Sequence, residues 1–418
     1  MRTILQFSAW AILASGMARA DELTDWNQVM LKAMLTAPVT PAPVTTRVAA
    51  IVQAAVFDAV NGIDRRYTPI YVPPAAPPGA SRGAAIVQAA YAALVNFYPD
   101  QKPKFDQQRT TSLAAIKDSS DAVKMGMAWG QHVADEIWTW RSQDGFSNTL
   151  PPFLGNTQPG QWRPTPPAMA PGLVPQLAKT NPWVIPSPSY FRPNGPADMT
   201  SDQYTSDFNE TKNMGGSNGS GRTADQTLFS NFWQAGNPPD YWDPVATSIA
   251  AQRNYSAVQT ARLLALVNLG IADAAIGCWD AKYTYSSWRP ITAIQLGDTD
   301  GNDATTLDPS WTPLIVTPPF PEYPSAHSCV SGAAGRILSA AFGEQTSFSV
   351  VSNAMPGVTR KFHSFSAALE EVKNARIFGG IHFRTACVDG QALGITVADY
   401  VMSRALVPLR GEHGGRGN

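Results

Sequence analysis

This chain of 418 residues carries little charge for its size, has few cysteines and contains no long basic run. Charged residues make up 15% of it and the formal net charge is −1. Nucleic-acid binding is therefore disfavoured, because phosphate backbones call for a clustered positive surface. The 3 cysteines form no Cys-x2-Cys pair, which disfavours a cysteine-rich zinc site. Beyond the N-terminus no segment has the ~20 uncharged apolar residues of a membrane span.

The N-terminus has the pattern of a secretory signal peptide over residues 1–20. Met1-Arg2 is followed by a mostly apolar run over 4–17 and then by Ala18-Arg19-Ala20. We expect cleavage before Asp21 and an exported protein, periplasmic or secreted.

The remaining chain is predicted to be all-α, with two four-helix-type bundles packed side by side. Helical periodicity recurs over 46–60, 84–97, 120–141, 223–233, 244–278, 328–341, 366–377 and 382–404. Residues 142–222 are rich in Pro, Gly, Asn and Ser, which predicts a long ordered excursion without regular helix. The predicted divisions are an N-terminal helical region (21–141), the excursion (142–222), a C-terminal bundle with the functional site (223–409) and a frayed tail (410–418).

Three short motifs in the last third of the chain combine into one candidate oxyanion site. They are Lys282 with Arg289-Pro290, then Pro324-Ser325-Ala326-His327, then Arg376 with His382. The spacing of Lys282 and Arg289 predicts one face of a helix that ends at Pro290. Gly379-Gly380 should separate the helix that carries Arg376 from the next one.

These residue types suit a tetrahedral or trigonal-bipyramidal oxyanion. Cations neutralise its oxygens, while the Ser325 hydroxyl and the Ala326 N–H donate to them. A helix that begins after Ser325 would add free N–H groups and a positive dipole end. Imidazoles such as His327 and His382 can act as ligand, nucleophile or acid/base, although each alone could be a satisfied structural histidine.

The order and spacing of the motifs resemble the superfamily that joins vanadium-dependent haloperoxidases to type 2 phosphatidic acid phosphatases and bacterial acid phosphatases. Stretches such as Asp25–Gln28, Ala55–Asn61 and Phe208–Lys212 resemble its soluble bacterial haloperoxidase-like branch. Two places depart from the pattern. Ala326 stands where the second motif usually has Gly, and Ala386 stands where many relatives have Asp, four residues after the histidine. Asp389 comes three residues too late to replace it.

The resemblance implies one of two reactions in the same cage. As a haloperoxidase, the protein would bind vanadate with His382 as axial ligand, with Lys282, Arg289, Arg376, Ser325 and Ala326 on the equatorial oxygens, and would use hydrogen peroxide to oxidise halide. His327 would then move protons. As a phosphatase, it would need no cofactor: His382 would attack a phosphoester and His327 would protonate the leaving alcohol. A non-catalytic periplasmic oxyanion binder is a third reading, motivated by Ala386.

Two aromatic residues bear on that choice. Trp279 stands three residues before Lys282, and Phe320 stands seven before His327. In chloroperoxidase-like relatives such aromatics line a pocket that is thought to serve halide, which favours the haloperoxidase; the alternative is that both belong to the core.

The cysteines and the buried acidic residues have structural interpretations. For the cysteines, Cys329 with Cys387 is the preferred pair if a disulfide forms, and the alternative is three buried thiols that include Cys278. Asp58, Asn61 and Asp273 are expected to satisfy buried polar partners.

Overall fold

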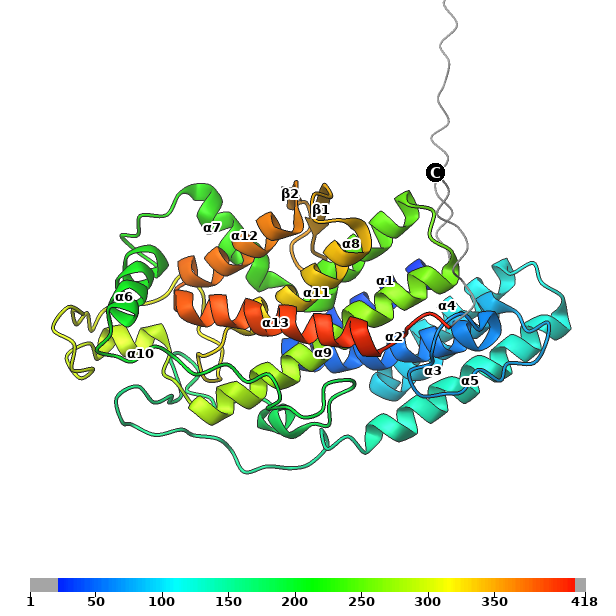
Figure 1. Cartoon of the computed structure of the whole chain (residues 1–418), viewed down its shortest axis with the longest axis horizontal. Helices are drawn as coiled ribbons and strands as arrows, with labels where there is room; N and C mark the ends of the chain where they lie inside the picture. Colours follow the sequence, from blue (N-terminus) through cyan, green and yellow to red (C-terminus); the bar gives the residue numbers. More distant parts are fainter. Residues whose placement is uncertain (1–21, 410–418) are drawn as a thin grey trace, which may run out of the picture.

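The computed structural model describes residues 22–409, and this part of the chain is mainly helical, as the sequence predicted (Figure 1). The predicted signal peptide (1–20) and the predicted tail (410–418) lie outside the described residues. In chain order the elements are α1 (Glu22–Leu35), α2 (Ala42–Asp64), α3 (Arg82–Phe97), η1 (Pro99–Gln101), α4 (Lys102–Ala115), α5 (Ser120–Ser142), η2 (Pro175–Lys179), α6 (Asp202–Gly215), α7 (Ala224–Ala235), α8 (Pro238–Gln252), α9 (Ala257–Tyr285), α10 (Pro290–Gln295), α11 (Ala326–Phe342), β1 (Phe348–Val351), β2 (Thr359–Phe362), α12 (Phe365–Phe378) and α13 (Arg384–Arg404).

Helix starts follow the local sequence closely. Six helices begin after a Ser, Thr or Asn whose side chain accepts a hydrogen bond from a backbone N–H of the first turn, which satisfies a donor that has no partner within the helix. These cap residues are Ser81, Ser119, Ser201, Thr223, Asn237 and Ser364. Together they fix where the predicted helices enter the two bundles.

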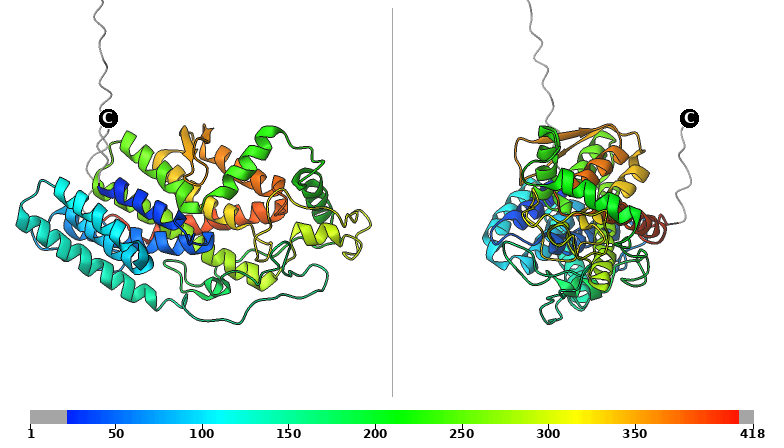
Figure 2. Two further views of the ribbon diagram at one scale, coloured as in Figure 1. Left: turned by 180° about the vertical axis from the view of Figure 1, so that it is seen from behind. Right: turned by 90° about the vertical axis from the view of Figure 1, so that its left-hand side faces the viewer.

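Helix α9 is the shared core element of the molecule. It packs against α2 on one side and against α11 and α13 on the other. The helices α3, α4 and α5 lie at one end of the molecule, and α6 and α10 lie at the other (Figures 1 and 2). Both α2 and α9 are long and apolar enough to cross a membrane, but 94% of each apolar window is buried inside the protein. Their burial is that of core helices.

The Pro- and Gly-rich excursion runs along the outside of the molecule in Figure 1 and is held to α9 by a buried carboxylate. Asp273 on α9 accepts hydrogen bonds from the backbone N–H groups of Trp183, Val184 and Ile185 at 2.7–3.0 Å. Asp58 on α2 holds residues 70–72 in the same way. The expectation that Asp58 and Asp273 satisfy buried polar partners is confirmed.

Four predictions about the elements were wrong in detail. Helix α6 lies inside the excursion, because Ser201 caps a segment that lacks Pro. The predicted helix over 244–278 is two helices, α8 and α9, which are separated at 253–256. Helix α9 ends at Tyr285, where Ser286 adopts a left-handed conformation, so Lys282 and Arg289 do not share a helix. Helix α13 begins at Arg384, two residues after His382.

The preferred Cys329–Cys387 disulfide is absent. Cys278, Cys329 and Cys387 are all buried free thiols, which is the other alternative that the sequence left open. The Cys278 Sγ atom lies 3.6 Å from the carbonyl oxygen of Pro324, so this thiol packs against the second motif.

Candidate functional site: a buried oxyanion cage

The first motif contributes two fully buried cations. Lys282 lies in the last turn of α9, and its ammonium donates to the carbonyl oxygens of Pro321 and Glu322, each at 2.9 Å. An ammonium has three donors, so one remains for a ligand. Arg289 caps α10, and its guanidinium donates to the carbonyls of Phe320 at 2.8 Å and Ile381 at 2.7 Å. These bonds fix both cations against the loop that carries the second motif.

The second motif forms the start of a helix, as predicted. Ser325 caps α11, which begins at Ala326, and the Ser325 side chain makes no capping bond of its own. Its hydroxyl instead accepts from the Ser328 hydroxyl at 3.2 Å, which leaves its proton free to donate. Ala326 is absent from the residues with positive φ, so a side chain is compatible with the backbone at this position. The Ala326 N–H is thus available without glycine.

The third motif places Arg376 and His382 on either side of a turn. Arg376 lies in the last turn of α12, and Gly380, with a φ of 75°, reverses the chain after it. His382 follows just before α13. The Nε2 atom of His382 lies 3.2 Å from a guanidinium nitrogen of Arg289, which brings the first and third motifs together.

Several buried nitrogen atoms of these residues have no partner among residues 22–409. They are Nη2 of Arg289, Nε and Nη1 of Arg376, and Nε2 of His327. Buried polar atoms are normally hydrogen-bonded, so unpartnered cationic donors on neighbouring motifs indicate a site built for an anion. Arg376 has one bond, from Nη2 to the side-chain oxygen of Gln234 at 2.9 Å, which orients its free edge. This donor set fits the oxygens of vanadate or phosphate.

The electrostatics point in the same direction. Burial lowers the pKa of Lys282 to about 8 and that of Arg289 to about 9, and the two cations repel each other. Burial, followed by the nearby cations, also holds the pKa of His327 and of His382 well below its usual value, so both imidazoles are neutral. Buried cations without full compensation would be relieved by a bound anion.

An apolar cavity of about 170 Å³ lies next to the cage. Trp279, Phe320, Ala326 and His327 line it, together with Leu173 from the excursion and residues at the start of α2. The rings of Trp279 and Phe320 lie 5.1 Å apart. The Phe320 ring also lies 5.1 Å from the Lys282 ammonium and 4.8 Å from the Arg289 guanidinium. The two predicted pocket aromatics therefore meet beside the cage.

Sequence reasoning missed two polar groups of the site. Gln234 at the end of α7 supports Arg376, and nothing in its local sequence marks it. Glu322 accepts from the Nδ1 atom of His382 at 2.9 Å and from the Phe383 N–H at 3.0 Å. It stands between the aromatic and the serine of the second motif, so its position was a usable signal. Asp389 instead accepts from the Tyr323 hydroxyl at 2.6 Å.

Comparison with known protein families gives matches on the part of the chain that carries the cage. The family profile described as the VCPO second helical-bundle domain matches residues 262–411. Vanadium chloroperoxidase from Curvularia inaequalis is 28% identical over 153 residues, which is 30% of this chain and 24% of the relative. The matched segment thus spans about a quarter of that relative's length.

Solved structures extend the likeness to most of the chain. A bacterial vanadium-dependent iodoperoxidase superposes with a TM-score of 0.82 at 26% identity, covering 94% of this chain and 97% of the other. A holo-type bacterial vanadium-dependent chloroperoxidase shares the fold, with a TM-score of 0.69 at 17% identity over 87% of this chain and 91% of the other. Together with the three motifs assembled into one cage, these matches are consistent with the superfamily that joins vanadium-dependent haloperoxidases to type 2 phosphatidic acid phosphatases.

Proposed function

We propose that this protein is a vanadate-dependent haloperoxidase that uses hydrogen peroxide to oxidise halide at a vanadate held by His382. The observation that carries the proposal is the apolar cavity, in which Trp279 and Phe320 meet beside His327 at the edge of the cage. A cage for an oxyanion needs only donors and cations. An adjoining small apolar cavity with aromatic walls adds a place for a weakly hydrated halide.

Each residue of the cage would have a distinct role in binding the anion. Arg289 and Arg376 would donate from their unpartnered nitrogens, and Lys282 from its remaining proton, to oxygens of the bound anion. Ser325 and the Ala326 N–H would complete this shell. Bound vanadate would supply a Lewis acid that activates peroxide. Because the cations are already fixed by backbone carbonyls, binding requires little reorganisation.

His327 is arranged to accept a proton. Its Nε2 atom is buried and has no partner among residues 22–409. With the ring proton on Nδ1, Nε2 would present a lone pair beside the cage. A neutral imidazole in this form can take a proton from peroxide or water and return it later.

The phosphatase remains the second candidate, because the same cage fits phosphate. The observation that favours it is the neutral His382 imidazole, whose Nε2 accepts from Arg289 and so holds the lone pair that a phosphoryl nucleophile requires. In that reaction His327 would have to carry a proton to the leaving alcohol, and the negative charge of the bound ester would raise its pKa toward that role.

One pair of assays on the purified protein separates the candidates. Peroxide-dependent bromide or iodide oxidation is measured after vanadate loading, and p-nitrophenyl phosphate hydrolysis is measured without vanadate. We expect halide oxidation that phosphate inhibits by competition. Phosphoester hydrolysis without halide oxidation would establish the phosphatase, and vanadate binding without either reaction would establish a non-catalytic oxyanion binder.

We also propose that the protein is exported after removal of residues 1–20, on the strength of the N-terminal sequence pattern. Sequencing the N-terminus of protein recovered from the native host should return Asp21 first. A chain that retains residues before Ala20 would contradict export by this route.

A further inference from the structure

Glu322 is a buried carboxylate that connects all three motifs. It is 2% exposed, its backbone carbonyl accepts from Lys282, and its carboxylate accepts from His382 Nδ1 and from the Phe383 N–H. The last two bonds share the same oxygen, Oε1. The side chain thus fixes the segment that leads from the turn after α12 into α13.

The hydrogen bonds of His382 define which nitrogen carries its proton. Arg289 can only donate, so the Nε2 atom that lies 3.2 Å from its guanidinium must accept. In a neutral imidazole the other nitrogen then carries the proton. Nδ1 therefore donates to Glu322, and the lone pair of Nε2 points toward the cage.

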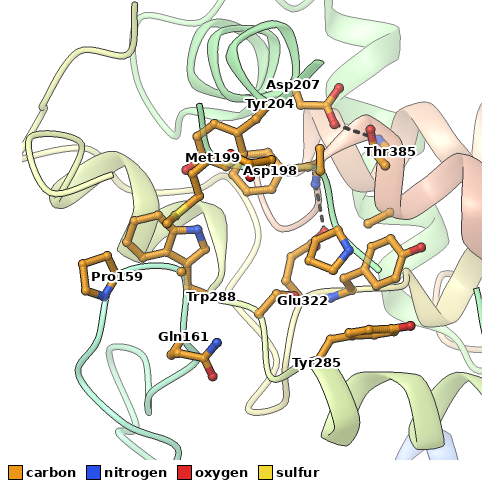
Figure 3. A pocket seen from close by; sticks show the side chains of 17 residues that line it. Pro159, Gln161, Asp198, Met199, Tyr204, Asp207, Tyr285, Trp288, Glu322 and Thr385 are labelled. Carbon is orange, nitrogen blue, oxygen red and sulfur yellow. Dashed lines mark hydrogen bonds between the residues drawn. The ribbon is translucent and has the colours of Figure 1, made fainter. Parts of the chain in front are cut away.

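Ala386, four residues after His382, is a second position from which a carboxylate could support the His382 ring. Ala386 and Glu322 line one cavity of about 320 Å³, on whose wall Thr385 is also held by Asp207 (Figure 3). The carbonyl of Ala386 accepts from the Ser325 N–H at 2.9 Å, so this turn of α13 packs directly on the second motif. A carboxylate at position 386 would therefore stand on the wall of the cavity that Glu322 also lines.

We propose that Glu322 is the positioning residue for His382: it holds the Nδ1-protonated tautomer and ring orientation from the loop before α11, a task that a carboxylate at position 386 could perform from α13. The partner of a ligating or nucleophilic histidine sets which nitrogen is free to react. The inference rests on the proposed anion site but is the same for vanadate and phosphate.

The test combines four variants with two measurements. Glu322→Ala removes the acceptor, Glu322→Gln keeps an acceptor oxygen, and Glu322→Ala with Ala386→Asp moves the carboxylate. Asp389→Asn is the matched control, since Asp389 bonds to Tyr323 and not to His382. Nitrogen-15 NMR of the anion-free protein reports the His382 tautomer, and calorimetry gives the dissociation constants of vanadate and phosphate. Circular dichroism checks that each variant is folded.

We expect Glu322→Ala to lose the single Nδ1–H tautomer and to bind vanadate about 10–100-fold more weakly. Glu322→Gln and the double variant should recover the tautomer and most of the affinity, and Asp389→Asn should resemble the wild type. A folded Glu322→Ala protein with the wild-type tautomer and affinity would overturn the proposal. The proposal would also be overturned if neither Glu322→Gln nor the double variant recovered the tautomer and the vanadate affinity that Glu322→Ala had lost.

Failure of the proposed function gives a different result. If the wild-type protein bound neither vanadate nor phosphate, the anion site itself would be wrong. The tautomer of His382 in the anion-free protein would still decide whether Glu322 positions the ring. Should Glu322→Ala fail to fold, Glu322→Gln and the double variant carry the same comparison.

Discussion

At the scale of single residues, the two histidines have different surroundings although both are neutral. His382 is 1% exposed and bonds through both ring nitrogens, to Glu322 and Arg289. His327 lines the apolar cavity and has one free nitrogen. The first arrangement suits a ring that is fixed against a bound group, and the second suits a ring that exchanges protons.

These surroundings predict different results for the two alanine variants. His382→Ala should abolish turnover and weaken vanadate binding, because His382 is the side chain proposed to hold the anion. His327→Ala should lower turnover by about 10²–10⁴-fold, the usual contribution of an acid–base group, and leave vanadate affinity largely intact. Calorimetry and steady-state kinetics on both variants test this. Full activity in His382→Ala, or equal loss of vanadate affinity in both, would contradict the assignment.

Lys282 predicts a pH dependence of anion binding. Burial lowers its pKa to about 8, and only the ammonium form attracts an anion. The free site therefore loses a cation as the pH rises through about 8, and phosphate affinity should fall. In Lys282→Arg the charge persists to a higher pH, because a guanidinium starts from a much higher pKa than an ammonium. We expect a steeper loss of affinity in the wild type than in Lys282→Arg between about pH 7 and about pH 9.5. Equal slopes in the two calorimetric series would exclude Lys282 as the titrating group.

At the scale of elements, the excursion depends on α9. Asp273 accepts three backbone N–H bonds from residues 183–185, and Leu173 of the same excursion lines the cavity. The Leu173 carbonyl also accepts from the Trp279 indole at 3.3 Å and from the Tyr283 hydroxyl at 2.8 Å. The stability of this wall of the site therefore depends on the hydrogen bonds that hold the excursion to α9.

Asp273→Ala should loosen that wall. It leaves three N–H groups without an acceptor, at about 1–3 kcal/mol for each group that stays buried. We expect the free energy of unfolding to fall by about 3–5 kcal/mol, and by less in Asp273→Asn, which keeps one oxygen. Denaturant unfolding measures this change, and limited proteolysis should show new cleavage within residues 142–200. Asp58→Ala is the control, because it releases residues 70–72 and should not expose the excursion.

The elements also show where sequence reasoning succeeded. The helix after Ser325 and the break at Gly380 were predictable, because each depends on a cap or a glycine within a few residues. Glu322 was not recognised although it stands beside the second motif, because nothing in the local sequence identifies His382, 60 residues away, as its partner. Helix α6 was missed because the composition of the whole excursion outweighed its one capped, Pro-free segment.

At the scale of the whole molecule, the cage and its cavity come from different parts of the chain. The cage residues all lie in the second half of the chain, whereas the cavity is also lined by the start of α2 and by Leu173 from the first half. Because α9 packs against both α2 and α11, the two helical groups meet along the helix that carries Trp279 and Lys282. The packing of the two bundles thus forms the wall that distinguishes this site from a bare oxyanion cage.

The contribution of that aromatic wall to halide oxidation can be tested by removing one ring at a time. If halide oxidation depends on it, Phe320→Ala should reduce bromide oxidation strongly. Vanadate affinity should change little, because Phe320 has no hydrogen-bond donor and its contacts with the two cations are worth about 0.5–2 kcal/mol. The Trp279 indole N–H is already bonded to Leu173, so Trp279→Ala should likewise spare vanadate affinity.

Trp279→Phe separates the aromatic surface from the bond to Leu173. It keeps a ring against Phe320 but removes the indole donor. Activity close to that of the wild type would assign the effect to the aromatic wall, whereas activity as low as in Trp279→Ala would assign it to the position of Leu173. A phosphatase would show only modest changes in all three variants, since its bond-breaking steps require the cage and the two histidines. Retention of full bromide oxidation in both alanine variants would therefore remove the observation on which the haloperoxidase proposal rests.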